Sequence, residues 1–511
     1  MQREVIDGVP VLWSAAPGPL EAALVFGHGA SDETFRTIGV THLVEHLAMS
    51  TLPRLHHEHN ASVSLTVTDF SVSGTDEQVV DFLAAVCKAL AALPVDRIER
   101  EAGVLAAEAS GVIDPVTAEL LSARYGTVGA GLASWGGPGP DRIAVEAVRE
   151  TVARSFHAGN AVLLLTGPPP PALRLPLPPG ERPERGGAQP VMSPGPHWVV
   201  ANVPGPGLAL HADLDGAALT AAHAVLQERL RQVLRHREGL SYDVDGARVH
   251  TGGGLGEFTV VVDARAGQQR RVAEILWREA LRLAAEGMTE AELAEEVAGF
   301  REVWLDPRAL PAELGQAGAC LLSNIPYQDA TARLDALAAV DPDGARQAFA
   351  AALRTALLVV PEDVEVELAQ PDGAPLTEGG CAHPRGGELP SGGRHFKPPM
   401  FARLRFPQAR TARLVLTDDA VWSRDGRGDV HHLPFADVVG VEVNGPGRVL
   451  FGRGNCATPV VPELFAGIGE AVAAIDAGVP KELHYELSAF AESDEDEGEA
   501  APAPVSKASR R

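Results

Sequence analysis

The stretch GVTHLVEHL, residues 39–47, carries His42 and His46 four positions apart within a run of helical apolar spacing. On a helix, residues at this separation lie one above the other on the same face, so both imidazoles can bind one metal ion. Glu45 stands beside the pair and can accept a proton from a metal-bound water. The order of these residues is the inverse of the HExxH zinc motif. The stretch therefore predicts a zinc site on a helix over residues 38–50.

A catalytic zinc needs a third protein ligand and an open position for water. Residues 96–109 have the pattern of a second helix, in which Glu101 and Glu108 lie two turns apart on one face. Two such carboxylates are also common on a solvated helix face. We assign Glu108 as the third ligand of one zinc ion per chain, and Glu101 as a carboxylate that orients a histidine ligand.

A second group of candidate ligands comprises His56, His57, Glu58 and His59, shortly after Pro53. The proline favours a loop here, and polar side chains are ordinary in loops. We therefore interpret the group as a polar loop. The alternative is a role at the rim of a cleft.

Segments rich in proline and glycine divide the chain. Residues 167–196 cannot sustain a helix or a central strand and are expected to form a semi-rigid linker, and a similar break lies near residues 370–399. The C-terminal AESDEDEGEAAPAPVSKASRR has little to bury and is expected to be disordered. We accordingly expect a domain with the metal site (1–168), a linker (169–195), a second domain (196–370), a second linker (371–398), a β-rich domain (399–487) and an acidic tail (488–511).

Strand and helix patterns alternate in both larger domains. Two blocks of similar size and content indicate an α+β fold with a duplicated architecture. The expected elements are strands over 21–27, 62–72 and 256–264, and helices over 77–93, 217–236 and 268–286.

Short strand patterns dominate the third domain, and a helix pattern over residues 462–476 follows them. This order predicts a small barrel or sandwich capped by a helix, built as a unit independent of the first two domains. The strand candidates are residues 412–417, 420–425, 438–444 and 448–454.

Composition limits the classes of partner and the cellular compartment that we expect for this protein. The chain has 511 residues, of which 45% are apolar, and a formal net charge of −25. An acidic surface argues against a nucleic-acid partner, and the absence of a long apolar run argues against a membrane span. Its four cysteines form no CxxC pair and suggest no disulfide framework. With no signal peptide in residues 1–10, we expect a cytoplasmic protein.

Five segments, in order, resemble those of the insulinase or pitrilysin (M16) family of zinc metallopeptidases. They are GHGASDETFRTIGVTHLVEHLA (27–48), HNASVSLTVTDFSV (59–72), EREAGVLAAEASGVIDP (99–115), SFHAGNAVLLLTG (155–167) and LRHREGLSYDV (234–244). The resemblance spans about residues 1–370 and is to the small bacterial single-chain type, here with an added C-terminal domain. That added domain is similar to bacterial pleckstrin-homology-like domains.

The resemblance implies two similar α/β sandwich halves that face each other across a chamber. It implies an endopeptidase that hydrolyses peptides or unfolded segments, with Glu45 as the catalytic base. The peptide would add to a sheet edge at Asn60 and Ala61. Arg235 and Tyr242 would reach across from the second half to hold the substrate backbone. A second copy of the chain, or a related M16 subunit, is the expected protein partner.

The sequence departs from the family between the motif helix and Asn60, where LAMSTLPRLHHEHN (47–60) replaces a longer loop. The spacing from His46 to Glu108 is therefore shorter than usual. Two alternatives stay open. One is a non-catalytic member that binds peptides or a partner subunit. The other is a scaffold whose C-terminal domain docks on a lipid or a protein, although its few Lys and Arg clusters argue against anionic lipid.

Overall fold

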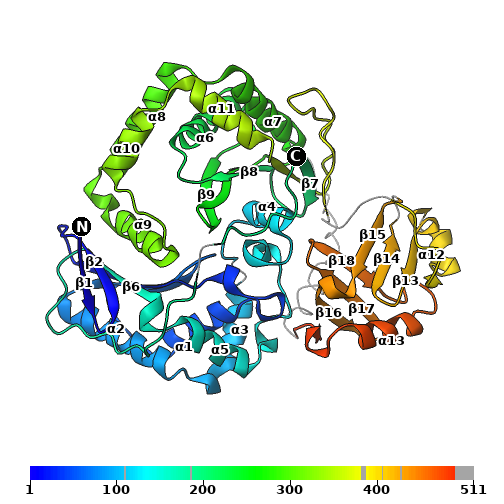
Figure 1. The fold of residues 1–511 in the computed structure, drawn as a ribbon, viewed down its shortest axis with the longest axis horizontal. Coiled ribbons are helices and arrows are strands. Elements are labelled where there is room, and N and C mark those ends of the chain that lie inside the picture. Colours follow the sequence, from blue (N-terminus) through cyan, green and yellow to red (C-terminus); the bar gives the residue numbers. More distant parts are fainter. Residues whose placement is uncertain (109–110, 185–186, 381–386, 406, 426–427, 489–511) are drawn as a thin grey trace, which may run out of the picture.

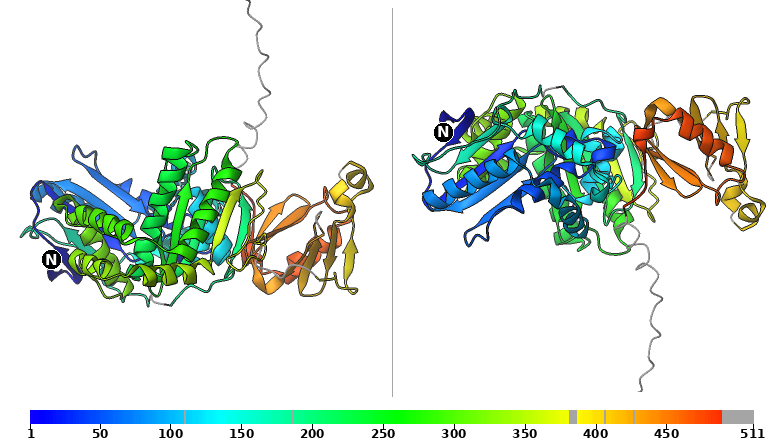
Figure 2. Two further views of the ribbon diagram at one scale, coloured as in Figure 1. Left: turned by 90° about the horizontal axis from the view of Figure 1, so that it is seen from above. Right: turned by 90° about the horizontal axis from the view of Figure 1, so that it is seen from below.

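The computed structural model describes residues 1–488 apart from 109–110, 185–186, 381–386, 406 and 426–427. The chain forms two α/β halves and a C-terminal domain on one side of them (Figures 1 and 2). Most of the expected acidic tail, residues 489–511, lies outside the described residues.

The first half is a six-stranded sheet in the order β1-β2-β6-β3-β5-β4, so β4 is an edge strand. Along β5, Phe70 and Val72 are buried against α1 and α2, while Asp69, Ser71 and Ser73 alternate onto the opposite face. The strands are β1 (Gln2–Ile6), β2 (Val9–Trp13), β3 (Leu20–Phe26), β4 (His59–Val63), β5 (Thr68–Gly74) and β6 (Ala161–Leu165), and the helices are α1 (Val40–Met49), α2 (Asp76–Ala91), α3 (Ile98–Glu108), α4 (Pro115–Tyr125) and α5 (Val145–Ser155).

The second half repeats this plan with the strand order β7-β11-β8-β10-β9. The parallel pair β7–β11 corresponds to β2–β6, and the other pairs are antiparallel in both halves. The expected duplication is therefore confirmed. The strands are β7 (His197–Ala201), β8 (Gly207–Asp213), β9 (Val244–Gly252), β10 (Leu255–Val262) and β11 (Leu357–Pro361), and the helices are α6 (Ala217–Leu230), a π-helix (Arg231–Arg237), α7 (Gln269–Glu286), α8 (Glu290–Trp304), α9 (Leu310–Ser323), α10 (Ala330–Ala338) and α11 (Pro342–Leu353).

The two halves exchange one helix each. Helix α4 belongs to the first half by sequence, but its Val116 and Leu120 pack on Ala209 and Leu357 of the second sheet. Helix α9 of the second half lies on the first sheet, where Leu314 joins a cluster with β2, β3 and β6 (Figure 1). Each sheet thus buries its second face under the other half's helix, which ties the halves together.

Residues of both halves enclose a cavity of 770 Å³, which supports the expected chamber. Asp32 and Thr66 line it from the first half, and Arg248 and His250 from the second.

The C-terminal domain packs two four-stranded sheets, β12-β13-β14-β15 and β18-β17-β16-β19, with helix α13. Its own core includes Leu414, Val441, Leu450 and Ile475, all buried. The elements are β12 (Arg394–Phe396), α12 (Met400–Arg405), β13 (Arg413–Leu416), β14 (Ala420–Arg424), β15 (Val430–Pro434), β16 (Val438–Asn444), β17 (Gly447–Gly452), β18 (Cys456–Val460), α13 (Gly469–Gly478) and β19 (His484–Tyr485).

Some expected elements are wrong in detail. The single strand expected over 62–72 is two antiparallel strands, because the Ser64 amide bonds to the Val67 carbonyl and closes a turn. The helix expected over 462–476 begins only at Gly469, after Gly467 adopts a left-handed φ of 72°. Strands β15 and β18 were not expected, since histidines and a proline obscure their alternation.

The cysteines correct a second expectation. Cys87 and Cys320 are free, but Cys456 is disulfide-bonded, and Cys381 lies outside the described residues. Spacing in the sequence cannot show which distant cysteines meet in space.

The segment 169–195 contains no helix or strand among its described residues, yet Leu173 and Leu175 are buried in the core of the first half. Within the described chain, no single helix has the length and apolarity to cross a membrane. One pair of helices passes on length and composition, with a bend of 83° between them.

Candidate metal centre

Helix α1 begins where the sequence forces a turn. Gly39, its N-cap, has a φ of 88°, which glycine adopts without steric cost. The Glu33 carboxylate accepts hydrogen bonds from the amides of Gly39 (2.8 Å) and Thr41 (2.9 Å) at the helix start. The buried Leu43 and Leu47 hold the other face of α1 in the core. These contacts fix the face that carries the motif histidines.

The three expected ligands meet at one point. Glu108 Oε2, at the end of α3, lies 3.4 Å from Nε2 of His42 and 3.4 Å from Nε2 of His46. The ligand atoms of the three residues all lie within 4.8 Å of one another. Among the described residues this is the one group of this kind that could hold a metal ion.

These separations fit a tetrahedral zinc ion. Ligands about 2.1 Å from a tetrahedral centre are roughly 3.4 Å apart. Burial lowers the pKa of His42, His46 lowers it further, and Glu108 opposes both. A lowered pKa favours the neutral imidazole, the form that binds a metal.

Glu45 lies beside the ligands without being one of the group. Its Oε2 is 3.5 Å from Nε2 of His42 and 3.8 Å from Nε2 of His46. Burial, together with the charges of Glu108 and Asp69, raises the pKa of Glu45 to about 7. A carboxyl group in this range can both accept and release a proton near neutral pH. Nothing in the sequence marked Asp69 of β5, whose charge acts on Glu45.

Glu101 lies on the expected side of His46, but its Oε2 is 3.9 Å from Nδ1, beyond hydrogen-bonding distance. Its side chain is buried, and its Oε1 makes no hydrogen bond within the described residues. Arg100 forms an ion pair with this carboxylate, its Nε 3.7 Å from Oε1, while Oε2 faces His46. Glu101 therefore stands on the side from which a carboxylate can orient this histidine.

A cavity of 450 Å³ opens from these residues onto the edge strand β4. Besides the ligands, Glu45 and Glu101, it is lined by Asn60, Ala61, Ser62 and Val63 of β4. Since β4 is the last strand of its sheet, its outer edge can pair with a further extended chain.

Arg235 and Tyr242 lie close to one another, as the turn at Gly239 (φ 63°) allows. The Arg235 guanidinium stands 5.0 Å from the centre of the Tyr242 ring, and 74% of Tyr242 is exposed. Neither residue lines the metal cavity. The structure brings the two together but does not bring them to the ligands.

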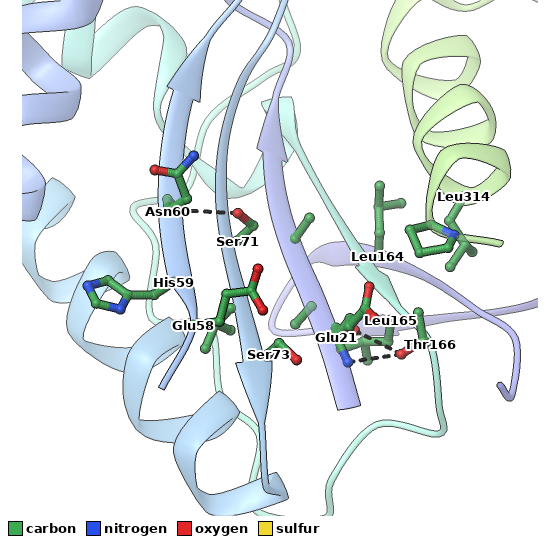
Figure 3. A pocket seen from close by; sticks show the side chains of 14 residues that line it. Glu21, Glu58, His59, Asn60, Ser71, Ser73, Leu164, Leu165, Thr166 and Leu314 are labelled. Carbon is green, nitrogen blue, oxygen red and sulfur yellow. Dashed lines mark hydrogen bonds between the residues drawn. The ribbon is translucent and has the colours of Figure 1, made fainter. Parts of the chain in front are cut away.

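The group at residues 56–59 stays outside the metal cavity. Figure 3 shows Glu58 and Asn60 at a groove on the face of the first sheet that α9 partly covers, together with Glu21 and with Leu314 of α9. The His59 ring lies toward α2, with its centre 6.1 Å from that of Phe82. Asn60 lines both this groove and the metal cavity, so the two adjoin along β4.

Comparisons with known proteins agree with this fold. Residues 142–300 match the family model described as the Peptidase M16 inactive domain. None of the curated proteins that were compared matches the chain. The matched region begins before α5 and ends within α8, so it includes none of the metal-site residues at 42–108.

Solved structures give the same result. A peptidase M16 inactive domain from Pseudomonas fluorescens has a TM-score of 0.57 at 16% identity, and the match covers 70% of this chain and 97% of that one. A protease from Helicobacter pylori has a TM-score of 0.55 at 15% sequence identity, and the match covers 70% of this chain and 98% of that one. The first half of the periplasmic protease PqqL from Escherichia coli has a TM-score of 0.53 at 15% sequence identity, and the match covers 71% of this chain and 92% of that one. The chain thus contains a region that matches the M16 inactive domain and has the fold of M16 structures over about 70% of its length.

Proposed function

We propose that the protein is a zinc-dependent endopeptidase of the M16 type, which hydrolyses peptides or unfolded segments between its two halves. The observation that carries the proposal is the meeting of His42, His46 and Glu108 at tetrahedral separations, with Glu45 beside them. Surface residues that matched the motif by chance would not converge from two helices.

Each residue has a distinct part in the reaction. His42, His46 and Glu108 would hold the ion, which would supply Lewis-acid activation of a water molecule and of the scissile carbonyl. The Glu45 carboxylate takes the proton of the attacking water and passes it to the leaving amine. Its raised pKa supports this double use. Glu101, whose Oε2 lies 3.9 Å from Nδ1 of His46, would orient this ligand.

The substrate would lie as an additional strand on β4. Backbone groups of Asn60 and Ala61 would pair with the peptide main chain, which places the scissile bond beside the ligands. Alternate side chains of the peptide would then face the groove of Figure 3. Arg235 and Tyr242 would hold the peptide from the second half, and their exposure leaves both free to contact it.

Metal analysis of the purified protein, combined with a peptide-cleavage assay, tests the proposal. We expect about one zinc per chain, cleavage of an unfolded peptide, and loss of cleavage with a chelator that zinc restores. Wild-type protein that carries no divalent metal, and gains none on dialysis against zinc, would exclude the site.

The match to an inactive domain favours one alternative, a member that binds peptides or a partner subunit without cleaving them. That match covers residues 142–300, which include α5 and β6 of the first half but none of the four motif residues, so it does not describe the motif. The same assay separates the two functions, because a pure binding protein would retain peptide and release no products. A second copy of the chain or a related M16 subunit remains our proposed protein partner.

A further inference from the structure

The C-terminal domain contacts the segment that leads into the motif helix. Phe35, in the short 3-10 turn Phe35–Thr37, is 3% exposed. Its ring centre lies 5.0 Å from that of Phe451 and 6.3 Å from that of Tyr485, both in the C-terminal domain. The ring of Trp135, in the first half, completes the cluster, with its centre 5.7 Å from that of Phe35. The contact buries a large aromatic side chain next to the metal site's own helix.

Polar contacts fix the same turn. Arg36 donates a hydrogen bond to the carbonyl of Glu482 (3.0 Å), and its guanidinium stands 4.9 Å from the centre of the Tyr485 ring. On the other side, β16 approaches so closely that a Cβ at Gly440 would lie 2.7 Å from the Phe35 ring. Glycine is therefore required at this position for the ring to stay where it is.

Glu33, two residues before the turn, links the position of Phe35 to the start of α1. Its carboxylate bonds to the amides of Gly39 and Thr41, and His42 follows directly. The turn Phe35–Thr37 lies between Glu33 and Gly39 in the chain, so moving Phe35 displaces one or both ends of this cap. This cap holds the first turn of α1, which carries His42, so it acts together with the buried Leu43 and Leu47 to place the histidine face.

We propose that the C-terminal domain positions the zinc site. It clamps Phe35 against Phe451 and Tyr485, and through Glu33 this contact sets the start of α1. Phe35 and Glu33 are accordingly positioning residues for the metal ligands. This inference rests on the proposed zinc function. It adds that docking of the domain and metal binding are coupled, and such coupling is reciprocal.

Gly440→Ala is the sharpest test, because it lies in the C-terminal domain and touches no metal-site residue. The added methyl group should push Phe35 aside and weaken zinc binding about tenfold or more, the range for losing support of a ligand. Gly469→Ala is the matched control, since it adds the same methyl group in the same domain with open space around it. Zinc affinity is measured by competition with a chromogenic chelator.

Amide hydrogen exchange gives a readout independent of activity. Gly440→Ala should lower the protection of the Thr41 and Leu43 amides in the metal-free protein, and Gly469→Ala should not. By reciprocity, zinc added to the wild type should raise protection at Tyr485. A purely structural role for the domain would not produce this zinc-dependent change.

A milder pair of variants covers the case in which Gly440→Ala does not fold. Phe35→Leu keeps an apolar side chain and should lose less zinc affinity than Phe35→Ala. Folded variants with wild-type zinc affinity and wild-type protection of α1 would overturn the inference. If the wild type binds no zinc, the proposed function fails, and equal α1 protection in Gly440→Ala and Gly469→Ala would then overturn the clamp as well.

Discussion

Glu108 Oε2 lies 3.4 Å from Nε2 of His46, although 62 residues separate them in the chain. This separation is what two ligands of one tetrahedral zinc ion require. Replacing His46 by alanine should therefore abolish zinc retention, because two remaining protein ligands do not hold the ion. His59→Ala is the matched control, since His59 is a nearby histidine whose ring faces α2. Atomic absorption on both variants checks this, and loss of zinc from His59→Ala would contradict the assignment.

The second half should contribute to turnover through Arg235 and Tyr242. Removing one positioned donor typically lowers the rate ten- to a thousandfold, so we expect that range for Tyr242→Phe and a comparable loss for Arg235→Ala. Zinc content and melting temperature should barely change, because neither residue is a ligand and Tyr242 is exposed. Peptide hydrolysis at saturating zinc measures the effect. Full activity in both folded variants would leave the second half a structural partner only.

Deleting residues 399–511 should destabilise the protein, in contrast to what the sequence suggested. The break near residues 370–399 indicated a unit independent of the first two domains. In the structure, Phe35, Leu132 and Trp135 would lose their cover from Phe451 and Tyr485. Exposure of such aromatic surface should lower the melting temperature by at least about 5 °C and promote aggregation. Scanning calorimetry of the truncated and full chains checks this, and an unchanged transition for the two halves would contradict it.

Acid should weaken the second half through His223. Burial lowers the pKa of this imidazole from 6.5 to about 4. Its Nε2–H donates to the Thr259 carbonyl (2.9 Å) and its Nδ1 accepts from Gln227 (3.0 Å), so a second proton has no acceptor. The unfolded chain binds that proton below pH 6.5, so stability is full above 6.5 and is lost as the pH falls toward 4. The loss should reach about 3 kcal/mol.

Urea unfolding of the metal-free protein at pH 7.5 and pH 5 measures this loss, with His223→Gln as the comparison. The variant should show a smaller decrease in its unfolding midpoint between the two pH values. An equal decrease in both proteins would assign the acid sensitivity to other groups.

The sequence predicted those parts of the site that depend on local geometry. The four-residue spacing of His42 and His46 puts both on one helix face. The helical pattern of residues 96–109 likewise put Glu108 on one face of a second helix, together with Glu101. Contacts between distant segments left no such signal. The exchange of α4 and α9, and the packing of Phe35 on Phe451, depend on how whole elements come together in space. The hydrogen bond from the Gly39 amide to the Glu33 carboxylate joins residues that are close in the chain, but no periodic pattern marks it.

The hairpin β4–β5 shows a further limit of prediction from a strand pattern. Its residues alternate in the same way on both sides of the turn, so the pattern could not reveal that Ser64 and Val67 close the chain on itself. Yet this turn produces the edge strand on which a substrate would lie. The strand pattern alone therefore did not separate β4 from β5, and the expectation of a sheet edge at Asn60 and Ala61 came from the family resemblance.

Glu45→Gln tests the central claim most directly. Glu45 lies beside the metal ligands but is not one of the three that converge. The variant should therefore retain about one zinc per chain, with the melting temperature of the wild type, and lose nearly all peptide hydrolysis. Zinc-loaded Glu45→Gln that cleaves peptide at the wild-type rate would contradict Glu45 as the base and the hydrolytic mechanism with it.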